Sequence, residues 1–387
     1  MIYLDNSATT KQHPKVTETM LRYMQEDFGN PSSLHSAGLA AEKAIKEARR
    51  RASKAMGRSS GTVTFTSGGT ESDNMAIFGV AKAMKRRGDR IVTTSVEHPA
   101  ILEPMKALED DGFEVVRLDV NRQGYIDMDQ LGSVVDEKTI LVSIMHVNNE
   151  VGTVMPVDEA AKVIRKKGSP ALLHIDAVQS FAKLPLPDPA DLISISGHKI
   201  HGPKGSGALW SREGINLRPH IFGGGQEAGL RSGTENVPAV AGLGEAAGIM
   251  EGCRKEAFAR VSRLREHMVE ALTSQIDEVV INGPEKVGEG PGCVSPYILS
   301  VSFMGTRGEV ILHTLEQDGI FISTGSACSS NKKGSSHVLS AMGLSEKEAE
   351  GTIRYSFSPD NTMDEIEEAA ERTADAVKKF RSLGSFR

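Results

Sequence analysis

The sequence predicts an α/β protein in which a large layered sheet flanked by helices is followed by a smaller α+β domain. Between about residues 60 and 210, short β-branched runs alternate with amphipathic segments, a pattern typical of repeated strand and helix units. After about Gly252 the alternation gives way to a long helical segment with short strands and helices behind it. A chain of 387 residues also exceeds what one hydrophobic core usually fills, so we expect two domains.

Apolar, β-branched runs bounded by turn residues define the strands of the predicted sheet. They cover residues 62–66, 90–95, 114–119, 139–145, 171–176, 191–196 and 207–210. The segments between them, such as 71–88 and 156–168, end in lysine or arginine followed by glycine, which is typical of helix C-termini. We interpret these segments as helices that cross from one strand to the next.

The C-terminal part of the sequence predicts a different arrangement. Its expected elements are a helix over 257–276, strands over 278–282 and 297–303, and a terminal helix over 362–380. The segment 281–296 is rich in glycine and proline, so we expect an exposed loop there. This part therefore has its own smaller set of strands and helices.

Composition and charge argue against several classes of protein. The net charge of −6 provides no general basic field for nucleic acid or for an anionic membrane. The N-terminus lacks a cationic leader followed by an apolar stretch, and no run of about 18 apolar residues occurs. We therefore expect a soluble, cytoplasmic protein that acts on small molecules or protein partners.

The cysteines and histidines do not form a metal-binding pattern. Cys253, Cys293 and Cys328 are too widely spaced for a disulfide framework or a CxxC zinc site. The histidines lack HExxH or similar spacing. We predict no metal site, and any functional cysteine is expected to act alone.

Polar residues after the predicted strands indicate a site for a small anionic molecule. The segment TSGGTESDN (66–74) places a small-residue turn between a strand and a helix, where free N–H groups and the helix dipole attract an anion. A simply capped helix would use the same residue types. GPKGSG (202–207) lacks the Walker A spacing, which disfavours a nucleoside triphosphate.

Two ionisable residues follow neighbouring predicted strands. Partial burial of Lys199 would favour its neutral, nucleophilic amine. Asp176 ends the preceding strand, and adjacent strands would bring it near Lys199, where a buried carboxylate keeps a ring nitrogen protonated. His98 and Asn148 lie at two other strand ends. His98 or Asn148 alone would more often be structural than functional, and an isolated Asp at a strand end usually caps a helix.

Together, these features resemble the pyridoxal-phosphate enzymes of the aspartate-aminotransferase fold and, more closely, the cysteine desulfurases. The matching motifs are YLDNSATT, FGNPSSLHSAG, TSGGTESDN, EHPAIL, NNEVGT, HIDAVQS, SGHKIHGPKG, GGGQEAGLRSGTEN and STGSACSS, in this order over nearly the whole chain. The resemblance implies fold type I: a large domain (13–251) with a mixed, mostly parallel seven-stranded sheet between helices. It also implies a smaller α+β domain made of residues 1–12 and 252–387.

The resemblance assigns a role to individual residues. Lys199 would bind pyridoxal 5'-phosphate covalently, and Lys199, Cys328 and His98 would be catalytic. Arg354 and Asn148 would bind the substrate. The residues expected to hold the cofactor are Gly69, Thr70, His98, Asn148, Asp176, Gln179, Ser196, His198, Lys199 and Thr234.

Within that set, Thr70, Ser196 and His198 would bind the phosphate, and Asp176 would pair with the ring nitrogen. Thr234 would reach the phosphate of the neighbouring subunit, which implies a homodimer. The chain departs from the family where Gly69 replaces a frequent alanine, and again in its dimer-edge motif, at Ala228, Leu230 and Glu235.

The loop 323–337 indicates which reaction follows, because the fold alone does not. It surrounds Cys328 with small and polar residues, and Lys332 and Lys333 favour the thiolate. An idle exposed thiol would show the same composition. We predict that Cys328 takes the sulfur of L-cysteine as a persulfide and that L-alanine is released. An acceptor protein would then take the sulfur for iron–sulfur cluster assembly or for tRNA or cofactor thiolation.

Two other interpretations stay open at this point. One is another pyridoxal-phosphate enzyme, such as a selenocysteine lyase or a small-substrate aminotransferase, although Cys328 argues against an aminotransferase. The other is a sulfur-relay platform that depends on an acceptor protein. The sequence has no signature that names the acceptor.

Overall fold

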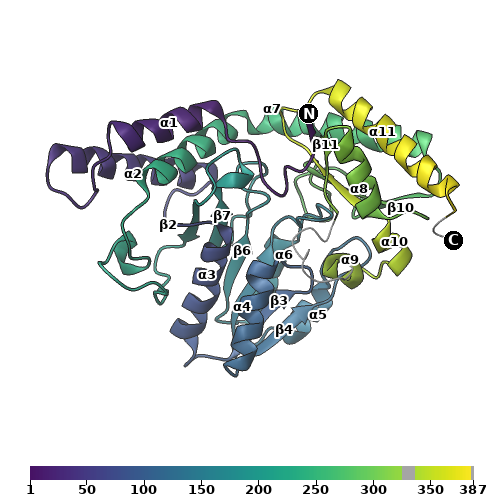
Figure 1. The fold of residues 1–387 in the computed structure, drawn as a ribbon. Coiled ribbons are helices and arrows are strands. Elements are labelled where there is room, and N and C mark those ends of the chain that lie inside the picture. Colours follow the sequence, from purple (N-terminus) through teal and green to yellow (C-terminus); the bar gives the residue numbers. More distant parts are fainter. Residues whose placement is uncertain (325–335, 385–387) are drawn as a thin grey trace.

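The computed structural model describes residues 1–324 and 336–384, which form a layered α/β body with a second group of elements at one end (Figure 1). The central sheet has seven strands in the order β2-β8-β7-β6-β5-β3-β4. β8 is antiparallel to both of its neighbours, and the other pairings are parallel. The predicted mixed, mostly parallel seven-stranded sheet is confirmed.

The strands lie within one residue of their predicted limits because they are apolar on both faces. Neighbouring residues of β3 illustrate this, since Ile91 and Val92 contact different hydrophobic clusters on opposite faces of the sheet. The strand bounds are β2 Thr62–Thr66, β3 Arg90–Thr94, β4 Glu114–Leu118, β5 Thr139–Met145, β6 Leu172–Asp176, β7 Leu192–Ser196 and β8 Gly207–Ser211.

Helices pack on both faces of this sheet. α3 and α4 contribute to the cluster on one face, and α2, α5, α6 and α7 contribute to the cluster on the other. The helices are α1 Pro14–Gln25, α2 Ser36–Ala55, α3 Gly69–Met84, α4 Pro99–Asp110, α5 Met128–Val134, α6 Val157–Lys166 and α7 Val237–Gln275. The predicted crossover segments 71–88 and 156–168 correspond to α3 and α6.

A third hydrophobic cluster joins the C-terminal elements to the N-terminus. β10 (Ile298–Phe303) lies between β9 (Val279–Asn282) and β12 (Thr352–Ser356) in an antiparallel sheet. β1 (Ile2–Tyr3) pairs in parallel with β11 (Ile320–Phe321), so Ile2 and Leu4 enter this cluster. The remaining helices are α8 Gly308–Gln317, α9 His337–Ala341, α10 Glu346–Glu350 and α11 Met363–Ser382. The domain limits at residues 12 and 251 stay a prediction.

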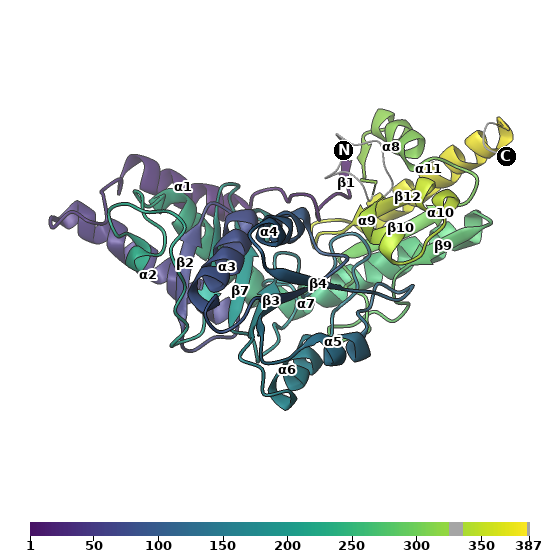
Figure 2. The ribbon, with the colours of Figure 1, turned by 90° about the horizontal axis from the view of Figure 1, so that it is seen from below.

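The helix α7 runs between the two parts and contacts α1, α2 and α11 (Figure 2). It starts at Val237, twenty residues before the predicted start at 257, and Asn236 caps it by accepting a hydrogen bond from the Ala239 N–H at 3.2 Å. Its first turns contain several glycines, which lower helix propensity. Packing against α1 and α2 outweighs that local preference. None of the described helices is long and apolar enough to cross a membrane.

The sequence predicted an exposed loop over the glycine- and proline-rich segment 281–296, but part of this segment is buried. Cys293, Val294 and Ser295 are buried. Val294 forms an isolated antiparallel bridge with Thr153, and the Val154 N–H donates to the Cys293 carbonyl at 2.9 Å. Backbone groups of this segment therefore form hydrogen bonds with a distant part of the chain, and no local sequence pattern predicts this pairing.

Two glycines of α7 test the importance of its contact with α2. A Cβ at Gly244 would lie 2.5 Å from Ala48 Cα, whereas a Cβ at Gly252 would meet nothing within 4 Å. We expect Gly244→Ala to lower the free energy of unfolding by about 1–3 kcal/mol, because the helices must separate. The matched control Gly252→Ala should raise it by up to about 1 kcal/mol, because alanine favours the helix. Urea titrations measure both, and equal effects would contradict close packing at Gly244.

Candidate active site

A cavity of about 280 Å³ lies where β6 and β7 end and α3 begins. Its wall brings together residues that are far apart in the sequence but were predicted to share a site. Those of the predicted set that line it are Gly69, Thr70, His98, Asp176, Gln179, Ser196, His198, Lys199 and Arg354. The carboxyl edge of a parallel sheet is the usual ligand position in such folds.

The phosphate end of the cavity is the start of α3. Gly68 precedes the helix and has no side chain to cap it, so the first-turn N–H groups face outward. Ser196 lines both the cavity and an adjoining hollow at this turn. Its buried hydroxyl has no hydrogen-bond partner among the described residues. An uncapped helix N-terminus with an unsatisfied hydroxyl suits a phosphate group.

The same turn lies close to the backbone of strand β8. A Cβ on Gly207 of β8 would lie 2.6 Å from the carbonyl carbon of Gly68. The absence of a side chain at Gly207 therefore lets the β2–α3 turn rest against β8. His198 also faces this end, and its Nδ1 lies 3.1 Å from Thr9 Oγ1. Burial and the nearby charge of Lys199 lower the pKa of His198 to about 4, so its ring is neutral.

Lys199 lies in the short 3-10 helix η1 (Gly197–Lys199) that directly follows β7. Its Nζ donates hydrogen bonds to the backbone carbonyl oxygens of Ala8, at 2.8 Å, and of Ser7. Both carbonyls belong to the N-terminal segment, which lines the cavity here. The sequence analysis gave Ser7 and Ala8 no role, although the motif YLDNSATT contains them.

Asp176 is the last residue of β6, and its carboxylate is nearly fully buried. Its Oδ1 accepts a hydrogen bond from the Val178 N–H at 2.9 Å. Burial raises the pKa of Asp176 to about 6, against the opposing effects of that hydrogen bond and of the Lys199 charge. A cation at this position would favour the carboxylate. The side chain is therefore suited to pair with a protonated ring nitrogen.

These groups together fit pyridoxal phosphate. The start of α3 and Ser196 match its phosphate, Asp176 matches its ring nitrogen, and the Lys199 amine matches its aldehyde. Gln179 also lines the cavity, and its Nε2 donates to the Ser7 carbonyl at 2.9 Å.

His98 forms another part of the wall as the N-cap of α4. Its Nδ1 accepts a hydrogen bond from the Ala100 N–H at 3.1 Å. Burial, followed by the charges of Lys199 and His337, lowers the pKa of His98 to about 4. A neutral ring with Nδ1 as acceptor carries its proton on Nε2. The residue can therefore exchange a proton without holding a charge at neutral pH.

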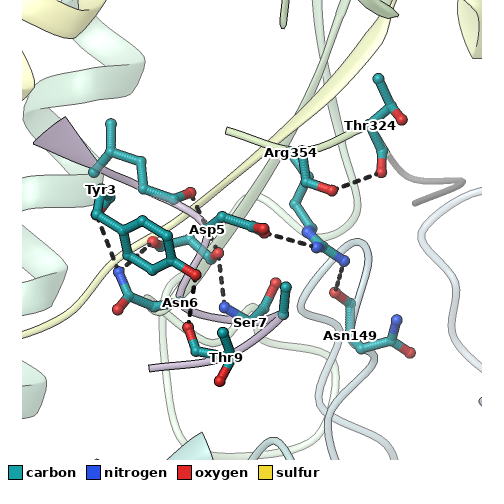
Figure 3. A network of polar contacts seen from close by, with 12 residues as sticks. Tyr3, Asp5, Asn6, Ser7, Thr9, Asn149, Thr324 and Arg354 are labelled. Carbon is teal, nitrogen blue, oxygen red and sulfur yellow. Dashed lines mark hydrogen bonds and ion pairs between the residues drawn. The ribbon is translucent and has the colours of Figure 1, made fainter. Parts of the chain in front are cut away.

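Arg354 of β12 also lines the cavity, and Figure 3 shows its contacts with Asp5 and Asn149. Its Nη1 donates to the Asn149 carbonyl at 3.0 Å, and its Nη2 donates to Asp5 Oδ1 at 3.1 Å. Its buried Nε has no hydrogen-bond partner among the described residues. A guanidinium fixed at two corners, with donor capacity left over, suits a substrate carboxylate.

The structure differs from the prediction at Asn148. The Asn148 side chain is fully buried, and its Oδ1 accepts hydrogen bonds from the N–H groups of Glu150 and Val151 at 2.9 and 3.0 Å. Its Nδ2 donates to the Val96 carbonyl at 3.0 Å. The amide is thus used within a turn, and the neighbouring Asn149 lines the cavity instead.

Thr234 is exposed on the loop before α7 and does not line this cavity. Cys328, with Lys332 and Lys333, lies outside the described residues. Their predicted roles rest on the sequence.

Two buried carboxyl groups near Asp176 were missed by the sequence analysis. Asp73 lines the cavity, and burial followed by the nearby Asp176 raises its pKa well above the usual value. Glu97 is fully buried, and burial raises its pKa to about 8. Its Oε1 accepts hydrogen bonds at 2.9 Å from Thr94 Oγ1 and from the Met145 N–H. Glu97 is therefore protonated at neutral pH. The only signal of these two residues in the sequence is that they lie within the motifs TSGGTESDN and EHPAIL.

The chain resembles known proteins over its whole length. The family model described as Aminotransferase class-V matches residues 2–368. A protein named cysteine desulfurase IscS from Dictyoglomus turgidum is 40% identical over 389 residues, covering 100% of this chain and 97% of that protein. Cysteine desulfurase IscS 1 from Archaeoglobus fulgidus is 41% identical over 387 residues, covering 99% of this chain and 98% of that protein.

Solved structures agree with these relatives. A structure titled NifS-like protein has a TM-score of 0.90 and 38% identity, covering 98% of this chain and 99% of its own. A structure titled SspA in complex with cysteine has a TM-score of 0.80 and 33% identity, covering 94% of this chain and 100% of its own.

The raised pKa of Glu97 predicts a pH-dependent stability. Because the folded-state pKa of about 8 exceeds the ordinary 4.5, the stabilisation is complete below pH 4.5 and is lost as pH rises through 8. Glu97→Gln removes this titration and keeps an acceptor oxygen. We expect its melting temperature, relative to the wild type, to rise between pH 6 and 9. The exposed control Glu18→Gln should show no such trend, and a parallel wild-type and Glu97→Gln profile would contradict the assignment.

Proposed function

This chain belongs to the class-V aminotransferase family and is a pyridoxal-phosphate-dependent cysteine desulfurase, and we propose how its cavity residues divide the work. The observation that carries the proposal is the convergence of Lys199, Asp176 and the start of α3 on one cavity. An amine, a carboxylate and an anion cradle match the three reactive ends of the cofactor.

The cofactor would be held at three points. Thr70, Ser196 and His198 would contact its phosphate, with Gly69 opening the turn, while Asp176 keeps its ring nitrogen protonated. His98 would lie against the ring and Gln179 beside its phenolic oxygen. When bound, pyridoxal phosphate supplies the electron sink that makes a Cα proton of the substrate acidic.

Lys199 would be the base that removes this Cα proton. The carbonyl oxygens of Ser7 and Ala8 accept hydrogen bonds from its Nζ, so they stabilise the ammonium that forms when the proton arrives. The neutral His98 stands on the same wall and would move a second proton during the reaction.

Arg354 would bind the carboxylate of L-cysteine. Asp5 and the Asn149 carbonyl fix its guanidinium before substrate arrives, which reduces the ordering cost of binding. Asn149 lines the cavity, which supports a substrate contact by this residue rather than by Asn148.

Cys328 would receive the sulfur. Its thiolate attacks the substrate sulfur, an S–S bond forms and the substrate C–S bond breaks. The bonding pair stays on the substrate carbon, which takes a proton and leaves as L-alanine, and Cys328 keeps the sulfur as a persulfide.

Both flanks of the Cys328 segment support this role. The Ser323 N–H donates to the Arg354 carbonyl at 3.1 Å, and His337 Nε2 lies 2.9 Å from the Glu97 carbonyl. Thr324 is four positions before Cys328, a tether of at most about 14 Å in extended chain. We infer that such a tether would let the thiol reach a substrate bound at Arg354.

A second copy of this chain is the first partner we propose. Exposed apolar side chains gather on α1, α2 and their connection, and on the loop that carries Thr234; they are Leu21, Met24, Phe28, Leu34, Leu39, Ile221 and Phe222. Such residues are typical of interfaces rather than of free surface. A homodimer would cover them and bring Thr234 to the neighbouring phosphate.

An acceptor protein, either an iron–sulfur scaffold or a thiolation enzyme, is the second partner. It would remove the persulfide sulfur from Cys328. The cytoplasmic location stays a prediction.

Two variants separate the roles of Lys199 and Cys328. Lys199→Ala should abolish the cofactor absorption band and reduce alanine formation at least about 10⁴-fold, because the covalent link and the base are both lost. Cys328→Ser should keep the band and lose the persulfide.

Intact-protein mass spectrometry after L-cysteine, with alanine quantified alongside, measures these outcomes. The wild type should gain one sulfur on Cys328 for each alanine formed. A Cys328→Ser enzyme that still releases sulfide at the wild-type rate would contradict the role of Cys328 as the nucleophile.

The fork of Arg354 gives a further test. Arg354→Lys keeps the charge but loses two-point binding, so KM for L-cysteine should rise about 10-fold or more, with the cofactor band unchanged. Steady-state kinetics measure the effect. An unchanged KM would indicate that a residue other than Arg354 binds the substrate carboxylate.

A further inference from the structure

The loop before α7 is tied to both sides of the turn that forms the phosphate cradle. We call residues 221–236 the bridging loop. The Phe65 N–H, just before the turn, donates to Glu227 Oε2 of this loop at 3.0 Å. The Ser67 N–H, inside the turn, donates to Glu71 Oε2 at 2.8 Å, and Glu71 is paired with Arg231 of the loop.

The first anchor centres on Glu227. Its carboxylate, with a side chain only 4% exposed, accepts two hydrogen bonds from Arg49 of α2, at 3.0 and 2.9 Å. The same guanidinium lies over the Phe65 ring, 4.9 Å from its centroid. The buried carboxylate thus joins α2, the edge strand β2 and the bridging loop at one point.

The second anchor reverses the roles of the partners. Here Arg231 of the bridging loop donates from Nε to Glu71 Oε1 at 2.9 Å, and the carboxylate lies in the first turn of α3. Burial would raise the pKa of Glu71, but the hydrogen bonds from Arg231 and Ser67 outweigh it and lower the pKa. Glu71 therefore stays ionised where it orders the cradle turn.

The backbone at the first anchor is strained. Glu227 and Ala228 have φ of 47° and 55°, a left-handed conformation that residues with a Cβ rarely adopt. Such conformations persist where surrounding contacts hold them. The contacts of the Glu227 carboxylate with Arg49 and Phe65 supply that hold.

From these contacts we propose that Glu227 and Arg231 are positioning residues that make phosphate binding depend on the bridging loop. The turn at 66–70 keeps its shape because both flanks are fixed to this loop, and the loop also carries Thr234 and the exposed Phe222. The inference rests on the proposed function only in taking this turn as the phosphate site.

The test compares two forms of the cofactor that differ only in the phosphate. Apoenzyme is titrated with pyridoxal 5'-phosphate and with pyridoxal, and the absorbance of the Lys199 adduct is followed. Glu227→Gln and Arg231→Gln should weaken binding of pyridoxal phosphate about 10-fold and change binding of pyridoxal less than about threefold. The control Glu245→Gln breaks an ion pair between α2 and α7 that touches neither the loop nor the turn, and should change neither affinity.

Each outcome decides the proposal. A selective loss for the phosphorylated form in either loop variant supports it, so one variant suffices if the other does not fold. Equal losses for both ligands, or no difference from Glu245→Gln, would overturn it. Failure of the wild type to bind pyridoxal phosphate would instead overturn the proposed function.

Discussion

The site depends on holding a half-buried amine and a buried carboxylate in one cavity at the edge of a sheet. Asp176 ends β6 and pairs in register with Ser194 of β7, so Lys199, five residues further on, comes to the same cavity. The Asp176 carboxylate is buried, and burial raises its pKa to about 6 although the hydrogen bond from Val178 and the charge of Lys199 oppose the shift. The backbone carbonyls at Ser7 and Ala8 and the N–H of Val178 supply the polar contacts that make this burial tolerable.

Burial also keeps three neighbouring ionisable groups neutral. It raises the pKa of Glu97 to about 8 and lowers those of His98 and His198 to about 4, so these side chains hold no charge near pH 7. The electrostatic field in this part of the cavity therefore comes mainly from Asp176 and Lys199, whose charged groups have hydrogen-bond partners. A cationic ring nitrogen brought to Asp176 would therefore meet no competing charge from Glu97.

The strands of the sheet and most residues of the cavity could be predicted from the sequence. Buried strands such as β5 are continuous apolar runs with turn residues at their ends, so their limits can be predicted closely. The start of α7 was missed because packing overrides its glycine-rich composition. Asn148 and Asn149 have the same side chain. Only the geometry of the turn determines that the Asn148 amide forms hydrogen bonds within the turn. The pair of Glu71 with Arg231 spans 160 positions and leaves no local pattern.

The N-terminal segment connects the reacting groups to one another. Asp5 accepts a hydrogen bond from Arg354 (Figure 3). The backbone carbonyls of Ser7 and Ala8 accept hydrogen bonds from Lys199. The preceding strand β1 pairs with β11, which leads into the segment that contains Cys328. One short stretch of chain therefore contacts Arg354 and Lys199, the proposed substrate anchor and base, and pairs with the strand that leads to the segment of Cys328. Because the same stretch belongs to the C-terminal hydrophobic cluster while Lys199 belongs to the large sheet, the two cores are held in the relative position that this chemistry needs.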